Sequence, residues 1–309
     1  MASRGRSSET SLRLCSRAPR MMSWSITVVL SGLCRRVDSN KCSSRGPGLQ
    51  PATRSVLDPT GPHHSLSGVL DGAMTDITAH VTQLGLLAEA DNRLVRTVDA
   101  LDDATYRQAS LLPDWTVGHV IAHLALNGEG LAGALHGVAT GVPTPMYACQ
   151  EARDDDIATL GVAAPSELRS RLMASTELFD REVADLPDDK WETTIERTPG
   201  NRAFKARSTV LMRIREVEIH HADLGVGYTS ADWSPAFCTL LLDSLRAFSS
   251  PVPFRVLARD LAQTWEYGEG EPTATVAGDA HALAWWLTGR GTGETLTSDT
   301  GTLPEVSAW

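Results

Sequence analysis

Cysteine is scarce in this chain and unevenly placed. Five of the 309 residues are Cys, and three of these lie within the first 73 residues. The other two, Cys149 and Cys238, are far apart and form no CxxC pair. This argues against a disulfide framework and against a cysteine-based zinc site. If the protein performs thiol chemistry, we expect the thiol to come from outside the chain.

The main part of the sequence also lacks positive charge and long apolar runs. Residues 1–73 hold ten of the 28 basic residues but four of the 38 acidic ones, so the remainder carries 18 basic and 34 acidic residues. Such an acidic body argues against binding to a nucleic-acid backbone. No apolar stretch is long enough to span a bilayer. We therefore expect a cytoplasmic protein with small-molecule partners, and we expect it to be a monomer.

Residues 1–73 differ in composition from the rest of the chain. They are rich in Ser, Arg, Gly and Pro, and no helical or strand periodicity persists in them. One apolar run, Ser23–Leu33, follows basic residues as in a signal peptide, but no A-x-A-like cleavage site follows it. Met74 opens a stretch typical of the start of a cytosolic protein. We interpret 1–73 as a disordered tail or an over-extended reading frame.

Helical periodicity dominates the next part of the chain. A Thr before the second helix, a Pro at the start of the third and a Gly after the fourth are typical helix boundaries. A Gly/Pro-rich loop is expected between the second and third helices. The periodicity predicts a four-helix bundle within residues 74–231, with helices over 77–101, 117–135, 165–186 and 209–224.

Beyond residue 231 the pattern changes. A helix is expected near 234–248, followed by alternating, strand-like residues with turns at Gly268 and Gly270. A short amphipathic helix, "DAHALAWWLTGR", and a closing strand, "ETLTSDTG", complete the pattern. The fold class predicted for the whole chain is α+β, a helical bundle with a small C-terminal α+β domain over 232–309.

Two pairs of side chains have the spacing of a metal site. His119 and His123 are four residues apart on one predicted helix, and Glu216 and His220 are four apart on another. Residues at this spacing share one helix face, so facing helices could bring imidazole and carboxylate ligands to one ion. Such a set with an open position is typical of catalytic zinc. Surface pairs and packed histidines have the same spacing, so spacing alone leaves both interpretations open.

Four stretches of the sequence resemble a known protein family. They are "LLPDWTVGHVIAHLALN", "TGVPTPMYACQEARDDDI", "LMRIREVEIHHADLG" and, near the C-terminus, "TVAGDAHALAWWLTGRGTGETLTSDTG". From Met74 onward, the sequence resembles the mycothiol-dependent maleylpyruvate isomerase family, which is built on a DinB-like four-helix bundle with a small C-terminal domain. The resemblance does not extend to residues 1–73.

The resemblance implies specific site residues. Its metal ligands correspond to His123, Glu216 and His220, which leaves His119 and His221 as packing or supporting residues. The arginine of its "GRG" stretch corresponds to Arg290, which would dock a substrate carboxylate. An arginine at a helix C-terminus is also favoured by the helix dipole alone. Tyr147 and Arg153 lie in the matching loop and are our candidates for further substrate contacts.

The resemblance also implies a reaction. Mycothiol would supply the sulfur, and zinc would hold it as a thiolate at neutral pH. Addition of this thiolate to the conjugated cis double bond of maleylpyruvate, rotation and departure would give fumarylpyruvate, a step in aromatic (gentisate) degradation. Two alternatives remain: a mycothiol S-transferase acting on electrophiles, and a non-catalytic metal-binding or regulatory bundle.

Overall fold

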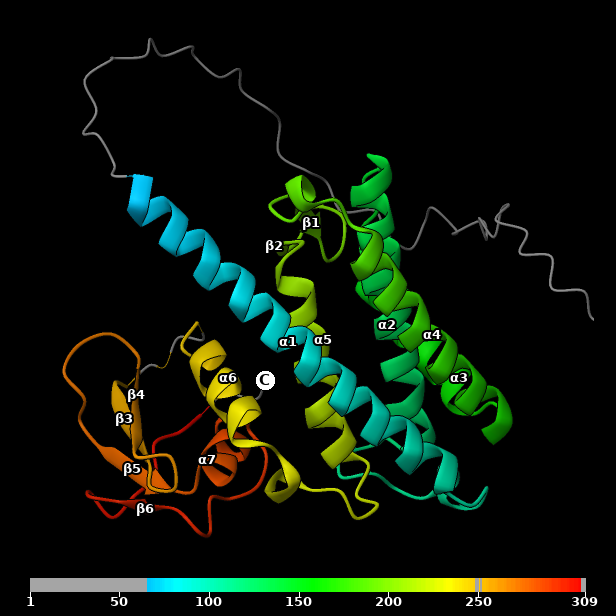
Figure 1. Ribbon diagram of the computed structural model, residues 1–309. Coiled ribbons are helices and arrows are strands. Elements are labelled where there is room, and N and C mark those ends of the chain that lie inside the picture. The colour runs from blue at the N-terminus through cyan, green and yellow to red at the C-terminus, as the bar shows by residue number, and fades with distance from the viewer. Residues whose placement is uncertain (1–65, 248–249, 251, 307–309) are drawn as a thin grey trace, which may run out of the picture. The chain divides into compact units, whose positions relative to one another are not determined.

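The computed structural model describes residues 66–247, 250 and 252–306, with side chains from residue 79 onward. Residues 1–65, which make up most of the segment interpreted as a tail or an over-extended reading frame, lie outside the described residues. Four long helices pack as a bundle, as the sequence predicts: α1 (Leu66–Ala100), α2 (Val117–Thr140), α4 (Pro165–Asp185) and α5 (Ser208–Asp223) (Figure 1). Helix α1 begins eleven residues before the predicted start at Ile77. No proline occurs between Pro62 and Pro113, so no helix breaker interrupts this region.

Local chemistry accounts for the helix boundaries. The Thr116 side chain caps α2 by accepting from the backbone N–H of His119. Gly141 ends the same helix at φ 74°, a left-handed conformation that glycine adopts readily. Pro165 occupies the first turn of α4, where its missing N–H would have no helical partner.

Two elements differ from the sequence-based expectation. Part of the expected loop and the residues after it form helix α3 (Gln150–Gly161), which packs against α2. A short antiparallel hairpin, β1 (Thr194–Glu196) and β2 (Ala203–Lys205), precedes α5. Helix α3 buries only Ile157, Leu160 and Gly161, so it has no apolar stripe to reveal it. The strands are three residues each, too short for a periodic signal.

The C-terminal region forms a four-stranded sheet with two helices. The strand order is β4-β3-β5-β6, with β3 and β5 parallel and the outer pairs antiparallel. The expected helices and strands are α6 (Pro235–Leu245), β3 (Phe254–Ala258), β4 (Gln263–Tyr267), β5 (Thr275–Gly278), α7 (Ala280–Leu287) and β6 (Thr297–Ser298). The α+β fold class is therefore confirmed.

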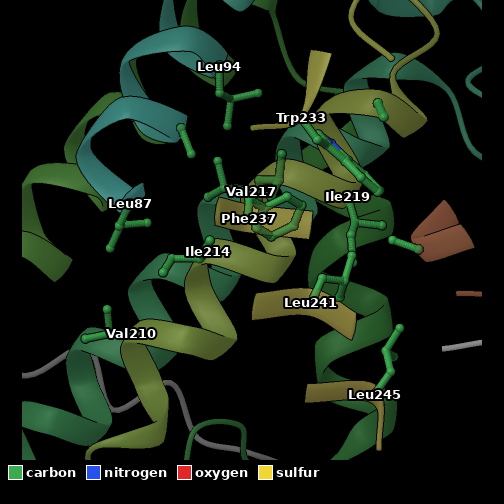
Figure 2. Close-up of a cluster of buried hydrophobic side chains, with 14 of the residues drawn as sticks. Leu87, Leu94, Val210, Ile214, Val217, Ile219, Trp233, Phe237, Leu241 and Leu245 are labelled. Atoms are coloured by element: carbon green, nitrogen blue, oxygen red, sulfur yellow. The ribbon is translucent and has the colours of Figure 1, made fainter. Parts of the chain in front are cut away.

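The apolar core continues from the bundle into the C-terminal region. Figure 2 shows Leu94 of α1, Val217 of α5 and Phe237 of α6 in one buried cluster. The Trp233 indole N–H, just before α6, also donates to the main-chain oxygen of Glu218 at 3.3 Å. This packing places α6 against α5, the helix that carries the candidate ligands. All described residues belong to one compact unit, Gly46–Trp309, and the predicted boundary near residue 231 stays a prediction.

Among the described helices, none is both long and apolar enough to cross a membrane.

Candidate metal centre

Two helices bring three ligand-type side chains together. His123 comes from α2, while Glu216 and His220 lie one turn apart on α5. The Nε2 atom of His123 lies 2.9 Å from Oε2 of Glu216, and Nε2 of His220 lies 3.3 Å from the same oxygen. One ligand atom from each residue falls within 4.8 Å of the other two. Two imidazole nitrogens and one carboxylate oxygen match the donor set that zinc prefers in catalytic sites.

The charge states of these groups depend on one another. Burial lowers the pKa of His123 to about 4, so this ring is neutral at pH 7. Burial alone would raise the pKa of Glu216, but hydrogen bonds with His123 and His220 hold it well below its ordinary value. Burial also opposes protonation of His220, yet hydrogen bonds to Asp223 and Glu216 raise its pKa. The site therefore combines a stable carboxylate, a neutral imidazole and an imidazole that retains its proton more tightly than usual.

Asp223, one turn beyond His220, orients that ring. Its Oδ2 lies 2.8 Å from Nδ1 of His220, which makes Nδ1–H the donor and leaves Nε2 directed at Glu216. Carboxylates that fix a histidine tautomer in this way are common behind metal ligands. Asp223 also accepts from Arg290. Asp223 was not among the site residues predicted from the sequence, although its i+3 spacing from His220 was a usable signal.

Arg153 contacts the other candidate histidine. Its Nη2 lies 3.2 Å from Nδ1 of His123, and its Nη1 lies 2.8 Å from Asp154. Because a guanidinium only donates, Nδ1 of His123 is the acceptor in this arrangement. The Arg153 guanidinium carbon also lies 5.7 Å from the centre of the Tyr147 ring. Tyr147 lies in the expected loop, but Arg153 lies in the first turn of α3 and not in a loop as the sequence suggested. Arg153 contacts the candidate ligand His123 directly, and Tyr147 contacts Arg153.

The remaining histidines near the site have other contacts. His119 completes the capping box of α2, with its Nδ1 2.7 Å from the Thr116 hydroxyl. His221 bonds the Thr97 hydroxyl of α1 at 2.9 Å and stacks on Tyr228 at 3.7 Å between ring centres. His119 shares the neighbouring Trp115 ring with His123, but within the described residues neither His119 nor His221 belongs to the group of converging ligand-type atoms.

Glu218, the second acid of this stretch, is also occupied elsewhere. It is buried and accepts hydrogen bonds from Arg93 of α1 and from the Tyr228 hydroxyl. The contact with Arg93 joins α1 to α5, so the two-residue offset between Glu216 and Glu218 separates a candidate ligand from a packing residue.

A cavity of about 600 Å³ opens beside the three candidate ligands. Its cationic character is pronounced, because five arginines line it and Glu216 is the only acid among its lining residues. Burial lowers the pKa of Arg215 to about 10, an effect that Glu216 opposes and the positive charge of Arg202 reinforces. The lining residues are Leu112, Trp115, His123, Arg153, Arg197, Asn201, Arg202, Phe204, Met212, Arg215, Glu216, His220 and Arg290.

Comparisons with known proteins agree with this geometry. Residues 87–225 match the family model described as the mycothiol maleylpyruvate isomerase N-terminal domain. A crystal structure of the mycothiol-dependent maleylpyruvate isomerase is similar at 29% identity and a TM-score of 0.68, over 74% of this chain and 97% of that one. A histidine-to-alanine mutant of that isomerase matches at 28% identity with the same TM-score and coverage. No curated protein sequence matches the chain.

Proposed function

Because residues 87–225 belong to the mycothiol maleylpyruvate isomerase N-terminal domain family, we propose that the chain is a zinc- and mycothiol-dependent enzyme that converts maleylpyruvate to fumarylpyruvate. The observation that carries this proposal is the convergence of His123, Glu216 and His220 on one point beside an arginine-lined cavity. The 29% identity to a solved isomerase, over nearly the whole length of that protein, supports the same reaction.

His123, Glu216 and His220 would hold the metal, each through the atom that now faces the other two. When bound there, zinc would lower the pKa of the mycothiol thiol and keep it as a thiolate nucleophile at neutral pH. Two neutral imidazoles and a single carboxylate leave the ion with a net positive charge, as this chemistry needs. All three side chains line the cavity, so thiol and substrate have access to the same place.

The chain contributes the remaining electrostatics. Maleylpyruvate carries two carboxylates, and guanidinium groups bind carboxylates through paired hydrogen bonds. Arg290 and Arg153 both line the cavity and are the substrate-docking residues of this proposal. Tyr147 would support Arg153, since the guanidinium lies over its ring. Asp223 would keep the metal-facing nitrogen of His220 free of a proton.

The role of His123 requires a local adjustment. In the described arrangement its Nδ1 accepts from Arg153, so its ring proton is on Nε2, beside Glu216. If Nε2 of His123 held an ion, the ring proton would sit on Nδ1, which could then no longer accept from a guanidinium. We infer that metal loading releases Arg153 from His123 and makes it available to a substrate carboxylate.

The decisive test is a steady-state assay of the zinc-loaded full chain with maleylpyruvate, with and without mycothiol. Isomerisation that requires both zinc and mycothiol supports the proposal. Conjugation of mycothiol to a generic electrophile, without isomerisation of maleylpyruvate, would instead identify an S-transferase. Zinc binding with no thiol-dependent reaction of either kind would favour the non-catalytic bundle.

A further inference from the structure

The turn of the β1–β2 hairpin places two arginines directly opposite each other. The strand register pairs Glu196 with Ala203, and the next pair along is Arg197 and Arg202, joined by an N–H to O=C bond of 2.9 Å. Directly opposed residues of an antiparallel pair project to the same face, and like charges in this position destabilise the hairpin. Both side chains line the cavity, together with Phe204 of the same face. A bound anion would offset the repulsion between the two guanidinium groups.

The carboxylates around the cavity do not provide that compensation. Arg290 is paired with Asp223, and Arg153 with Asp154. The Arg197 side chain instead donates to the neutral amide oxygen of Gln150 at 2.8 Å. Within the described part of the chain, neither Arg197 nor Arg202 forms a salt bridge. The hairpin end of the cavity therefore has more uncompensated positive charge than the Arg290 end.

Helix α5 sets the spacing between these two ends. Four residues of α5 line the cavity at positions i, i+3, i+4 and i+8, which share one helix face: Met212, Arg215, Glu216 and His220. Arg215 is close enough to Arg202 for the two positive charges to interact. Asp223 holds Arg290 two turns further along the helix, about 12 Å at the usual helical rise. Figure 1 shows the hairpin beside the start of α5. The candidate metal ligands lie between the two cationic ends.

We propose that Arg197 and Arg202 form a carboxylate-binding subsite, and that this subsite holds the end of a dicarboxylate substrate furthest from Arg290. The inference rests on the proposed function for the identity of the substrate, but the subsite itself follows from the hairpin. A carboxylate placed between the two guanidinium groups accepts charge-assisted hydrogen bonds from both and removes their mutual repulsion. An elongated dianion would then lie across the metal ligands, with its reacting carbons beside them.

The test uses the zinc-loaded full chain and an unreactive probe, maleate, with its uncharged diamide for comparison. Maleate binding is measured by calorimetric titration for the wild type, for Arg202→Gln and for Arg197→Gln/Arg202→Gln. Each lost guanidinium is expected to weaken maleate binding about tenfold or more, with zinc content unchanged. Arg181→Gln, an exposed arginine on α4 outside the cavity lining, is the matched control and should bind maleate like the wild type.

Two further measurements distinguish a loss of carboxylate binding from a loss of folded structure. The double variant should melt at the wild-type temperature or above, because the substitution removes a like-charge pair. Diamide binding should be the same in all variants. Wild-type maleate affinity in the double variant at full zinc occupancy would overturn the subsite, as would an equal loss of diamide binding.

The outcomes also distinguish this inference from the proposed function. If the wild type isomerises maleylpyruvate and the double variant does so with an unchanged KM, the subsite is wrong and the function stands. If the wild type does not isomerise maleylpyruvate but binds maleate through Arg197 and Arg202, the subsite stands and the proposed reaction is wrong.

Discussion

Arg290 holds the Asp223 carboxylate with two nitrogens: Nε lies 2.8 Å from Oδ1 and Nη2 lies 2.8 Å from Oδ2. Asp223 is 1% exposed, and such a buried charge is stable only when it is paired. Burial would raise its pKa, but hydrogen bonds from His220 and Arg290 lower it. The arginine of the C-terminal region is thus connected through one carboxylate to a candidate metal ligand in the bundle.

Asp223→Asn should weaken zinc binding by about 10- to 100-fold, the usual cost of losing the carboxylate behind a metal-bound histidine. The amide keeps the shape of the side chain but removes the charge that supports His220 and Arg290. Competition titration of zinc against a chelator measures the change. Asp243→Asn is the control, because its carboxylate bonds the Trp265 indole instead. Equal zinc affinity in wild type and Asp223→Asn would show that His220 needs no such support.

His123→Ala, Glu216→Ala and His220→Ala should each sharply lower zinc content, because each removes one of the three proposed ligands. The matched control is His136→Ala, since His136 also pairs with a glutamate, Glu182, but at an exposed position. Zinc content is measured on purified protein by metal analysis. Full occupancy in His123→Ala would mean that this histidine is not a ligand and would direct attention to His119.

The sequence carries part of this site in its helical spacing. Glu216 and His220 are one turn apart on a helix that the pattern predicts, and the structure brings them together. His119 and His123 are also four residues apart, so the spacing does not tell which of the two histidines is the candidate ligand. The choice follows from a capping contact, since Thr116 engages His119 and leaves His123 facing α5. Only the family resemblance selected His123 beforehand.

Other parts of the site depend on contacts that no local pattern encodes. Arg290 and Asp223 are 67 positions apart, and their pairing depends on how the C-terminal region packs against α5. The arginines of the hairpin become neighbours only through a turn of four residues and three-residue strands. Each relationship arises from tertiary packing, whereas periodicity reports only on which face of an element is buried.

Zinc affinity should fall with decreasing pH below the raised pKa of His220. Above that pKa the ring is neutral and can bind the ion; below it, a proton must leave first. Glu216 stays ionised and His123 stays neutral down to about pH 4. One proton is therefore displaced per ion, which corresponds to about a tenfold loss of affinity per pH unit. Zinc titrations across this range test the slope, and a pH-independent affinity would contradict the assigned charge states.

The same linkage acts on the metal-free protein with the opposite sign. Because the folded pKa of His220 is raised, its protonation stabilises the fold below the ordinary histidine pKa, and this contribution is lost as pH rises through the raised value. The metal-free protein should therefore lose stability at the pH where zinc begins to bind well. Melting temperatures measured against pH with and without zinc should therefore begin to separate at that pH. A constant difference between the two melting temperatures at every pH would argue against His220 as the titrating ligand.

Arg290→Ala should lower the kcat/KM for maleylpyruvate by about ten- to hundredfold at saturating zinc, since a charge-assisted bond to a carboxylate contributes roughly 1.5–3 kcal/mol. Arg290→Lys should recover only part of this loss, because an ammonium cannot bond both Asp223 oxygens and a substrate as a planar fork does. Measuring zinc affinity alongside the kinetics separates the two roles of this arginine. If zinc affinity falls and activity returns fully with added zinc, Arg290 acts only through Asp223 and His220. If activity stays low at full zinc occupancy, Arg290 acts on the substrate, as we propose. Wild-type turnover and zinc affinity in Arg290→Ala would exclude both roles and leave Arg153 as the substrate-docking residue.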